Sequence, residues 1–153
     1  MIEAVIFDWG RTIYDPESQQ LFPQTEQVLS NLTFRQLRLG LVSIADTSIE
    51  DRHEDLRRFG ISHFFQAVQI FGRREQKDFT EVLQGLRVEA SRSAVVGDNL
   101  GREITLGNRI GAYTIWTRQR LSGVYVPRNA EEMPKAIIEA IPELVSLIDK
   151  LNA

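Results

Sequence analysis

Two short apolar segments of the chain end in acidic residues that could do chemistry together. Residues 4–7 are apolar and stop at Asp8, and residues 93–97 are followed by Asp98. Such runs predict buried strands. Two carboxylates 90 positions apart, each at the end of a predicted strand, suggest a divalent-cation site, because Mg²⁺ takes oxygen ligands and usually only one or two carboxylates. The alternative is that each aspartate merely caps a loop or a helix.

The elements that must position these acids alternate along the chain. Hydrophobic spacing and glycine stop signals predict strands at 4–7, 41–44, 67–71, 93–97, 112–116 and 136–138, and helices at 25–38, 47–59, 78–87, 101–110 and from about 142. This alternation predicts an α/β fold, a doubly wound parallel sheet (Rossmann-like) in three α/β/α layers. Such sheets bind ligands at the carboxyl ends of their strands. Asp8, Ser43 and Asp98 therefore converge if their strands are neighbours.

Composition limits the other function classes. The 153 residues form one expected domain over 1–153, and the net charge of −3 argues against a nucleic-acid partner. The absence of cysteine excludes disulfides, thiolate zinc sites and a cysteine nucleophile, and the two histidines are too few for a histidine-rich metal site. The chain shows no targeting segment and no run long enough to span a membrane, so we expect a soluble, cytoplasmic protein.

Four motifs in order resemble those of the haloacid dehalogenase (HAD) superfamily. The stretch VIFDWGRTIYD at residues 5–15 resembles the first motif, in which hydrophobic residues precede DxDGTL. Residues 41–43 resemble the second motif, a strand that ends in Ser or Thr, and Lys77 ahead of a helix resembles the third-motif lysine. Residues 95–104 resemble the fourth motif, GDxxxxD. The resemblance covers residues from about 4 to 117 and implies the HAD core fold.

The same resemblance implies a magnesium-dependent hydrolase of the phosphatase type. Asp8 would attack phosphorus and form an aspartyl-phosphate, which divides one difficult step into two. Ser43 would hydrogen-bond a phosphoryl oxygen, and Lys77 would pair with the phosphoryl group and the Asp8 carboxylate. Asp98 would hold Mg²⁺, which neutralises charge and aligns the attack.

Asn99 and Glu103 follow Asp98 as expected supporting residues of the metal site. Glu103 stands where the family carries its last Asp of the fourth motif. It would reach the metal through water or orient Lys77. The alternative is a first-turn acid that complements the helix dipole.

Gly10 is the main departure from the family pattern. Phosphatases of the family carry a second Asp there, which protonates the leaving oxygen and then activates water. Glycine cannot transfer a proton, and loss of a positioned acid–base group costs roughly 10²–10⁴-fold in rate. The Gly10 carbonyl remains, and the resemblance makes it a metal ligand with Asp8 and Asp98. We therefore expect metal and phosphate binding with weak hydrolysis of alkyl phosphates; Asp15 and Glu103 are the nearest acids in sequence that could substitute.

Trp9 and Arg11 flank Gly10 and are expected to lie near the phosphate. Trp9 would shield the nucleophile or contact substrate, and the alternative is a core aromatic residue. Arg11 replaces the usual glycine and would bind a substrate anion, or else be only solvated.

The chain has no room for a cap domain in either of the two expected positions. About a dozen residues separate Thr12 from the helix at 25–38, and the 34 positions from Ser43 to Lys77 hold one helix and one strand. An uncapped site favours large phosphorylated substrates such as phosphoproteins or nucleic-acid ends, or closure by a second copy of the chain in a homo-oligomer.

Three hypotheses follow. The first is a magnesium-dependent HAD-like hydrolase with weak or specialised activity. The second is a dehalogenase or phosphonate-cleaving relative, which usually needs cap residues that this chain lacks. The third is a degenerate HAD domain that binds a phosphorylated ligand or protein without turnover, for which Gly10 is the chief support.

Overall fold

Six parallel strands form one sheet in the computed structural model, which describes residues 1–121 and 126–153. The strand order is β5-β4-β1-β6-β7-β8, and a separate two-stranded hairpin pairs β2 with β3. The strands are β1 (Ala4–Phe7), β2 (Tyr14–Asp15), β3 (Gln20–Leu21), β4 (Arg38–Ile44), β5 (Ala67–Phe71), β6 (Ser93–Gly97), β7 (Tyr113–Thr117) and β8 (Ala136–Ile138). The helices are α1 (Thr25–Phe34), α2 (Ile49–Arg58), α3 (Thr80–Leu86), α4 (Thr105–Arg109) and α5 (Glu143–Leu151).

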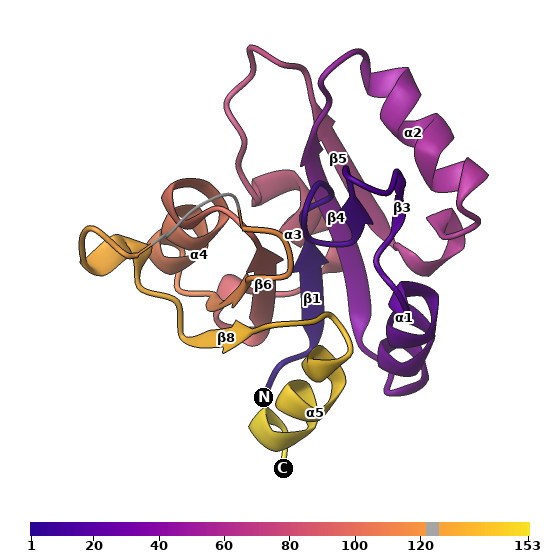
Figure 1. Ribbon diagram of the computed structural model, residues 1–153. Helices are drawn as coiled ribbons and strands as arrows, with labels where there is room; N and C mark the ends of the chain where they lie inside the picture. The colour runs from indigo at the N-terminus through magenta and orange to yellow at the C-terminus, as the bar shows by residue number, and fades with distance from the viewer. Residues whose placement is uncertain (122–125) are drawn as a thin grey trace.

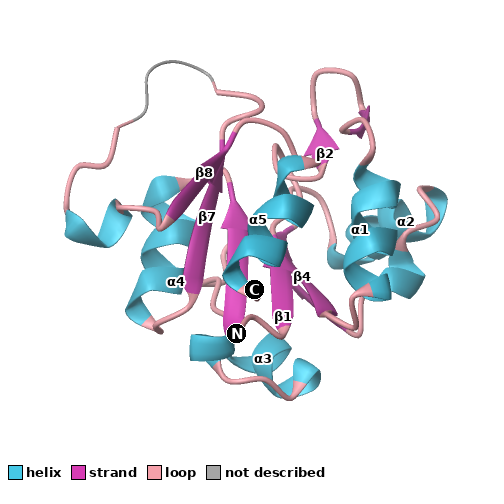
Figure 2. Ribbon diagram, turned by 90° about the horizontal axis from the view of Figure 1, so that it is seen from below, coloured by secondary structure: helices cyan, strands magenta, loops and turns pink. Residues whose placement is uncertain are grey.

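Helices cover both faces of the sheet, as Figures 1 and 2 show. Because side chains alternate across a strand, Val5 and Phe7 of β1 pack on one face with buried residues of α1 and α5. Ala4 and Ile6 point to the other face, where α3 supplies Val82 and Leu86. The predicted three-layer α/β/α fold is confirmed, and the described residues contain no cap domain.

The helix predicted at 25–38 is shorter than expected. It ends at Phe34, because Gln36 takes a left-handed conformation (φ 63°) and the Leu37 amide donates to the Leu32 carbonyl, which closes the last turn. Gly40, predicted as the stop signal, lies instead within β4. A β-carbon there would come within 2.8 Å of Val82, so the glycine lets α3 pack against the strand.

Two further elements differ from the sequence prediction. The stretch between Thr12 and α1, for which no strand or helix was predicted, contains the β2–β3 hairpin. The helix predicted at 101–110 is divided into a π-helix at Leu100–Ile104 and the α4 helix. The remaining strands and helices lie within a few residues of their predicted positions.

The two ends of the described chain meet beside β1 (Figure 1). The Ile2 amide donates to the Asn152 side chain at 2.7 Å, and that side chain donates back to the Ile2 carbonyl at 2.9 Å. No described helix is long and apolar enough to cross a membrane. The expectation of one domain over 1–153 includes residues 122–125, which lie outside the described residues, and it stays a prediction.

Candidate active site

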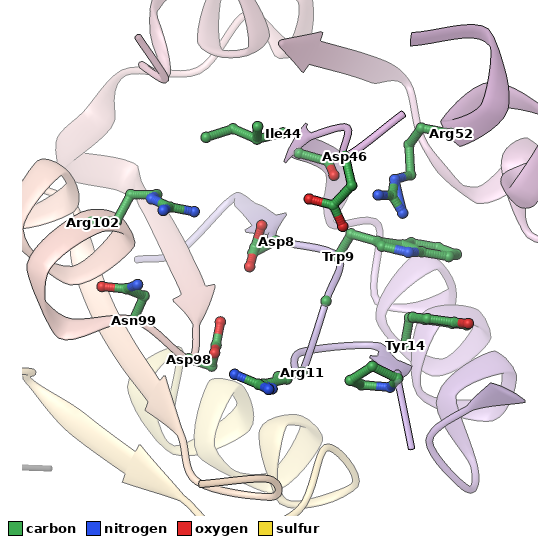
Figure 3. Close-up of a pocket in the computed structure, with 13 residues that line it drawn as sticks. Asp8, Trp9, Arg11, Tyr14, Ile44, Asp46, Arg52, Asp98, Asn99 and Arg102 are labelled. Atoms are coloured by element: carbon green, nitrogen blue, oxygen red, sulfur yellow. The ribbon is translucent and has the colours of Figure 1, made fainter. Parts of the chain in front are cut away.

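The sheet order brings the polar residues at the strand ends together. β1 lies between β4 and β6, and all three strands run parallel. Asp8 follows β1, Ser43 lies near the end of β4, and Asp98 follows β6, so the convergence predicted from the sequence is confirmed. They open on a pocket of about 400 Å³ (Figure 3). Its lining residues are Asp8, Trp9, Gly10, Arg11, Tyr14, Pro16, Ser43, Ile44, Asp46, Arg52, Asp98, Asn99 and Arg102.

Lys77 joins Asp8, which lines this pocket, to the buried Glu103. Its ammonium group donates to Asp8 Oδ1 and to Glu103 Oε1, each at 2.7 Å. The Lys77 side chain is only 2% exposed and that of Glu103 only 1%, while that of Asp8 is 12% exposed. A buried ammonium between two carboxylates is held in one position. The contact between Glu103 and Lys77 is the arrangement that an orienting role for Glu103 needs, and the role itself stays a prediction.

Gly97 and the π-helix allow Glu103 to reach this position. A β-carbon on Gly97 would lie 2.5 Å from the Glu103 β-carbon and 2.6 Å from its γ-carbon. The glycine thus leaves the space through which the glutamate passes. The wider turn of the π-helix follows directly after Asp98 and Asn99 and carries Glu103 inward, where one of its carboxylate oxygens, Oε2, has no hydrogen-bond partner among the described residues.

The charges of the cluster are not balanced. Burial, together with the negative charges of Asp8 and Glu103, raises the pKa of Asp98 to about 8. Burial and the Asp8 charge raise the pKa of Glu103, against the opposing effect of Lys77. Burial would lower the pKa of Lys77, but the Asp8 and Glu103 carboxylates outweigh it and raise that pKa. Lys77 thus pairs with two of three neighbouring carboxylates, and a cation beside Asp8 and Asp98 would relieve the remaining negative charge.

The donor set fits a divalent cation. One carboxylate oxygen from each of Asp8, Asp98 and Glu103 lies within 4.8 Å of the others. Asp8 and Asp98 line the pocket whereas Glu103 is buried behind it, so Asp8 and Asp98 are the two accessible carboxylates, the number that a magnesium ion typically takes. In the turn after Asp8, the backbone amides of residues 11–14 donate to the carbonyls of Trp9 and Tyr14. No hydrogen bond of the described residues ends on the Gly10 carbonyl, so this oxygen is available as a ligand.

Comparison with known families identifies the chain. Residues 1–117 match the haloacid dehalogenase-like hydrolase family. The chain belongs to this family. The resemblance seen in the four sequence motifs is thereby confirmed.

Individual relatives of the HAD family agree with this assignment. The chain is 27% identical over 143 residues to glyceraldehyde 3-phosphate phosphatase of Methanopyrus kandleri, a match that covers 90% of this chain and 61% of the relative. The chain thus spans less than two thirds of that curated relative.

Solved structures show the shared fold. The 2-haloacid dehalogenase from Pseudomonas syringae pv. Tomato DC3000 has a TM-score of 0.76 at 17% identity, over 99% of this chain and 100% of the other. The putative HAD-hydrolase YfnB from Bacillus subtilis has a TM-score of 0.67 at 23% identity, over 85% of this chain and 57% of the other.

Gly10, where HAD phosphatases carry their second Asp, has free space around it. A β-carbon built on Gly10 meets no atom within 4 Å, and the residue does not need a left-handed conformation. Arg11 does take that conformation (φ 61°) and is exposed at the pocket. A side chain could therefore be added at Gly10 without a clash, so packing does not require a glycine at this position.

Asp15 and Glu103, the two acids considered as substitutes for the missing one, are poorly placed to replace it. Two hydrogen bonds from Arg120, at 3.0 and 2.8 Å, hold the pKa of Asp15 well below its usual range, so it has no proton to give at neutral pH. Glu103 is buried against Lys77. Asp46 remains as an exposed carboxylate that lines the pocket, and the sequence analysis did not single it out.

Trp9 forms one wall of the pocket rather than an open contact surface. Its side chain is buried, and its ring stacks on Tyr14 with centroids 5.2 Å apart and planes 10° apart. The Arg52 guanidinium lies 5.1 Å from the Trp9 ring centroid (Figure 3). Packing was one of the two predicted roles for Trp9, and phosphate contacts by Trp9 and Arg11 stay predictions. The sequence analysis also missed Tyr14, Arg52 and Arg102, which line the pocket.

Proposed function

We propose that the chain is a magnesium-dependent hydrolase of the phosphatase type that works through an aspartyl-phosphate on Asp8. The observation that carries this proposal is the buried Lys77 ammonium group, which binds both Glu103 and the pocket-lining Asp8, with the Asp98 carboxylate nearby. This arrangement holds a carboxylate nucleophile in one orientation and supplies positive charge where phosphoryl oxygens would gather.

The residues divide the reaction between them. Lys77 holds Asp8 through Oδ1, which would fix the orientation of the carboxylate toward an incoming phosphoryl group. Ser43 donates from the end of β4, and Lys77 pairs with the developing negative charge. Asp8, Asp98 and the Gly10 carbonyl would hold Mg²⁺, with Asn99 and Glu103 around them. The ion would supply charge neutralisation and alignment of the phosphoryl group.

Gly10 makes this activity selective for substrates with good leaving groups. An aryl or acyl phosphate loses its leaving group without protonation, whereas an alkyl phosphate needs an acid. With no acid at Gly10 and Asp15 held ionised, alkyl phosphates are expected to be poor substrates.

The relatives support the reaction class and the metal. The Methanopyrus kandleri relative is named a phosphatase, and the Bacillus subtilis YfnB structure is described as bound to magnesium. A phosphorylated macromolecule, a homo-oligomer and a cytoplasmic location stay predictions from the uncapped site and the composition.

A HAD domain that binds a phosphorylated ligand without turnover is the second candidate. Gly10 favours it, because the proton-transfer group is absent while the ion-paired cluster remains. Both candidates use the same pocket, so a test of covalent chemistry at Asp8 separates them.

Beryllium fluoride, which mimics an aspartyl-phosphate, provides this test. With Mg²⁺ present, it should be trapped by the parent and not by Asp8→Asn, whose amide is nearly isosteric but a poor nucleophile. Asp149→Asn is the matched control. Asp149 is an exposed aspartate of the C-terminal helix α5 that pairs with Arg35, and this variant should trap beryllium fluoride normally. The parent should hydrolyse aryl or acyl phosphates slowly.

Gly10→Asp tests the missing acid directly. The space around Gly10 admits the new side chain, so alkyl-phosphate turnover should rise by about 10²-fold or more. Failure of the parent both to trap beryllium fluoride and to hydrolyse any aryl phosphate would favour the binding domain. Ready hydrolysis of alkyl phosphates by the parent would contradict the role given to Gly10 and direct attention to Asp46.

A further inference from the structure

The wall of the pocket contains an arginine whose hydrogen-bonding capacity is unused. Arg52 lies in the first turns of α2, and only 11% of its side chain is exposed. Its Nε atom is buried without a hydrogen-bond partner among the described residues. Its ion pair is a long one, 3.6 Å from Nη1 to Asp55, and Asp55 is shared with Arg58. Leaving guanidinium donors unpaired after partial burial is costly.

The position of Arg52 is fixed by packing. Its guanidinium lies over one face of Trp9 and Tyr14 stacks on the other face; we call these three residues the Arg52 stack. Phe59, which follows α2, packs against both aromatic rings, with centroids 6.1 and 5.9 Å away. Ser48 caps α2 by accepting from the Asp51 amide. The donors of Arg52 are therefore preorganised before any ligand arrives.

Arg52 faces the same pocket as the nucleophile. Figure 3 shows its guanidinium above Trp9, on the side of the pocket opposite Arg102, with Asp8 between them. Burial lowers the pKa of Arg52, while the negative charges of Asp55, Asp46 and Asp8 oppose that effect. Since Asp8 would be occupied by metal and phosphoryl group and Asp46 is exposed to solvent, neither saturates the guanidinium.

The aromatic ring below Arg52 offers no free face to a ligand. Arg52 covers one side of Trp9 and Tyr14 the other, so a planar leaving group has nowhere to stack on this wall. The pocket volume of about 400 Å³ is near the lower end for small-molecule sites. What the wall presents is a fixed fork of cationic donors, which matches a carboxylate or phosphate.

We propose that Arg52 binds a second anionic group, carried by the leaving group of a small phosphorylated substrate, and thereby selects that substrate. This inference rests on the proposed phosphatase function, since it assigns the part of the substrate beyond the phosphoryl group. Removal of the donors should weaken binding of such substrates without removing the chemistry at Asp8.

Two matched aryl phosphates test this assignment. 3-Carboxyphenyl phosphate carries the second anion, and 3-carbamoylphenyl phosphate has the same shape without the charge. In the parent, kcat/KM should favour the carboxylate by about tenfold or more, the usual worth of a charge-assisted hydrogen bond in a partly buried site. 1,3-Phenylene bisphosphate distinguishes a second phosphate from a carboxylate as the preferred anion.

Variants locate the effect. Arg52→Gln should reduce the carboxylate preference toward one, mainly through KM, and Arg52→Lys should keep part of it. Arg57→Gln removes an arginine on the same helix that is paired with Glu54 in solvent, and it should change nothing. Thermal unfolding of each variant shows whether it is folded. If Arg52→Gln is unfolded, Arg52→Lys decides the role of Arg52, because its carboxylate preference should be smaller than that of the parent.

Several results would overturn the inference. The first is an equal kcat/KM for the two probes in the parent, and the second is a preference that survives Arg52→Gln but is lost in Arg102→Gln. The third is a phosphopeptide hydrolysed more efficiently than either probe, which would remove the commitment to a small substrate. If the parent neither traps beryllium fluoride nor hydrolyses an aryl phosphate, the proposed function fails by itself, and calorimetric binding of the same pair of probes still decides the role of Arg52.

Discussion

Gly97→Ala tests whether the position of Glu103 controls the site. The added methyl carbon would lie 2.5 Å from the Glu103 β-carbon and 2.6 Å from its γ-carbon, far inside van der Waals contact. Because Glu103 is buried on all sides, it can yield only by moving the π-helix or by leaving Lys77. The substitution therefore disturbs the cluster without touching any group that contacts substrate.

The expected magnitudes come from the overlap and from the bond at risk. Overpacking of this kind costs about 1–3 kcal/mol, which lowers the melting temperature of a chain of this size by about 2–12 °C. Displacing a group that orients a site residue costs about 10–100-fold in metal affinity or activity. Both effects should appear in Gly97→Ala.

Gly107→Ala is the matched control. Its methyl carbon would lie 2.6 Å from the Thr114 γ-carbon, between α4 and the sheet and away from the cluster. The assay compares melting temperature, the Mg²⁺-induced shift of that temperature and aryl-phosphate turnover. Equal losses of turnover and Mg²⁺ response in the two variants, at equal loss of stability, would refute the reasoning.

Two further predictions concern pH. The pKa of Asp98 is raised to about 8, so the native protein binds more protons than the unfolded chain between about pH 4 and pH 8, and the metal-free protein should lose stability as pH rises through this window. Asp98→Asn should make that slope shallower, raise the melting temperature at pH 8 in chelator and abolish the Mg²⁺ shift; an unchanged Mg²⁺ response would place the metal elsewhere. The pKa of Asp15 is lowered by Arg120, so this pair stabilises at neutral pH and the contribution is lost as pH falls through the lowered pKa. Asp15→Asn should lower the melting temperature at pH 7, less so in acid, with aryl-phosphate turnover unchanged; a loss of turnover in the folded variant would show that Asp15 takes part in the chemistry.

The strands of the parallel sheet could be predicted from the sequence because each is a short, largely apolar run that ends near a polar or glycine residue. The predicted bounds of β1, β5, β6 and β8 match the structure. The β2–β3 hairpin could not be predicted in this way, since each of its strands has two residues and no apolar run. The order of the strands in the sheet could not be predicted either, because it depends on which face of the sheet each helix covers.

The site was predicted as far as the motifs reach. Asp8, Ser43, Lys77 and Asp98 meet as expected, and Lys77 crosses 69 positions of sequence to bind Asp8. Arg52 was missed, because it lies in a charged helix where most neighbours are solvated. Its direction depends on the stack with Trp9, a contact that no local pattern contains.

The pairing of β1 with β4 and β6 also determines when the site can first exist. Ala4 lies opposite Ser93, so Asp8 and Asp98 become neighbours only after the chain has been synthesised well past Asp98. Until then a ribosome-bound chain can pair β1 with β4 but lacks β6, so the carboxylates of Asp8 and Asp98 cannot come together. A Mg²⁺ ion held by both carboxylates would therefore bind only after β6 has joined the sheet, and its binding free energy would add to the stability of the finished fold rather than guide the early steps of folding.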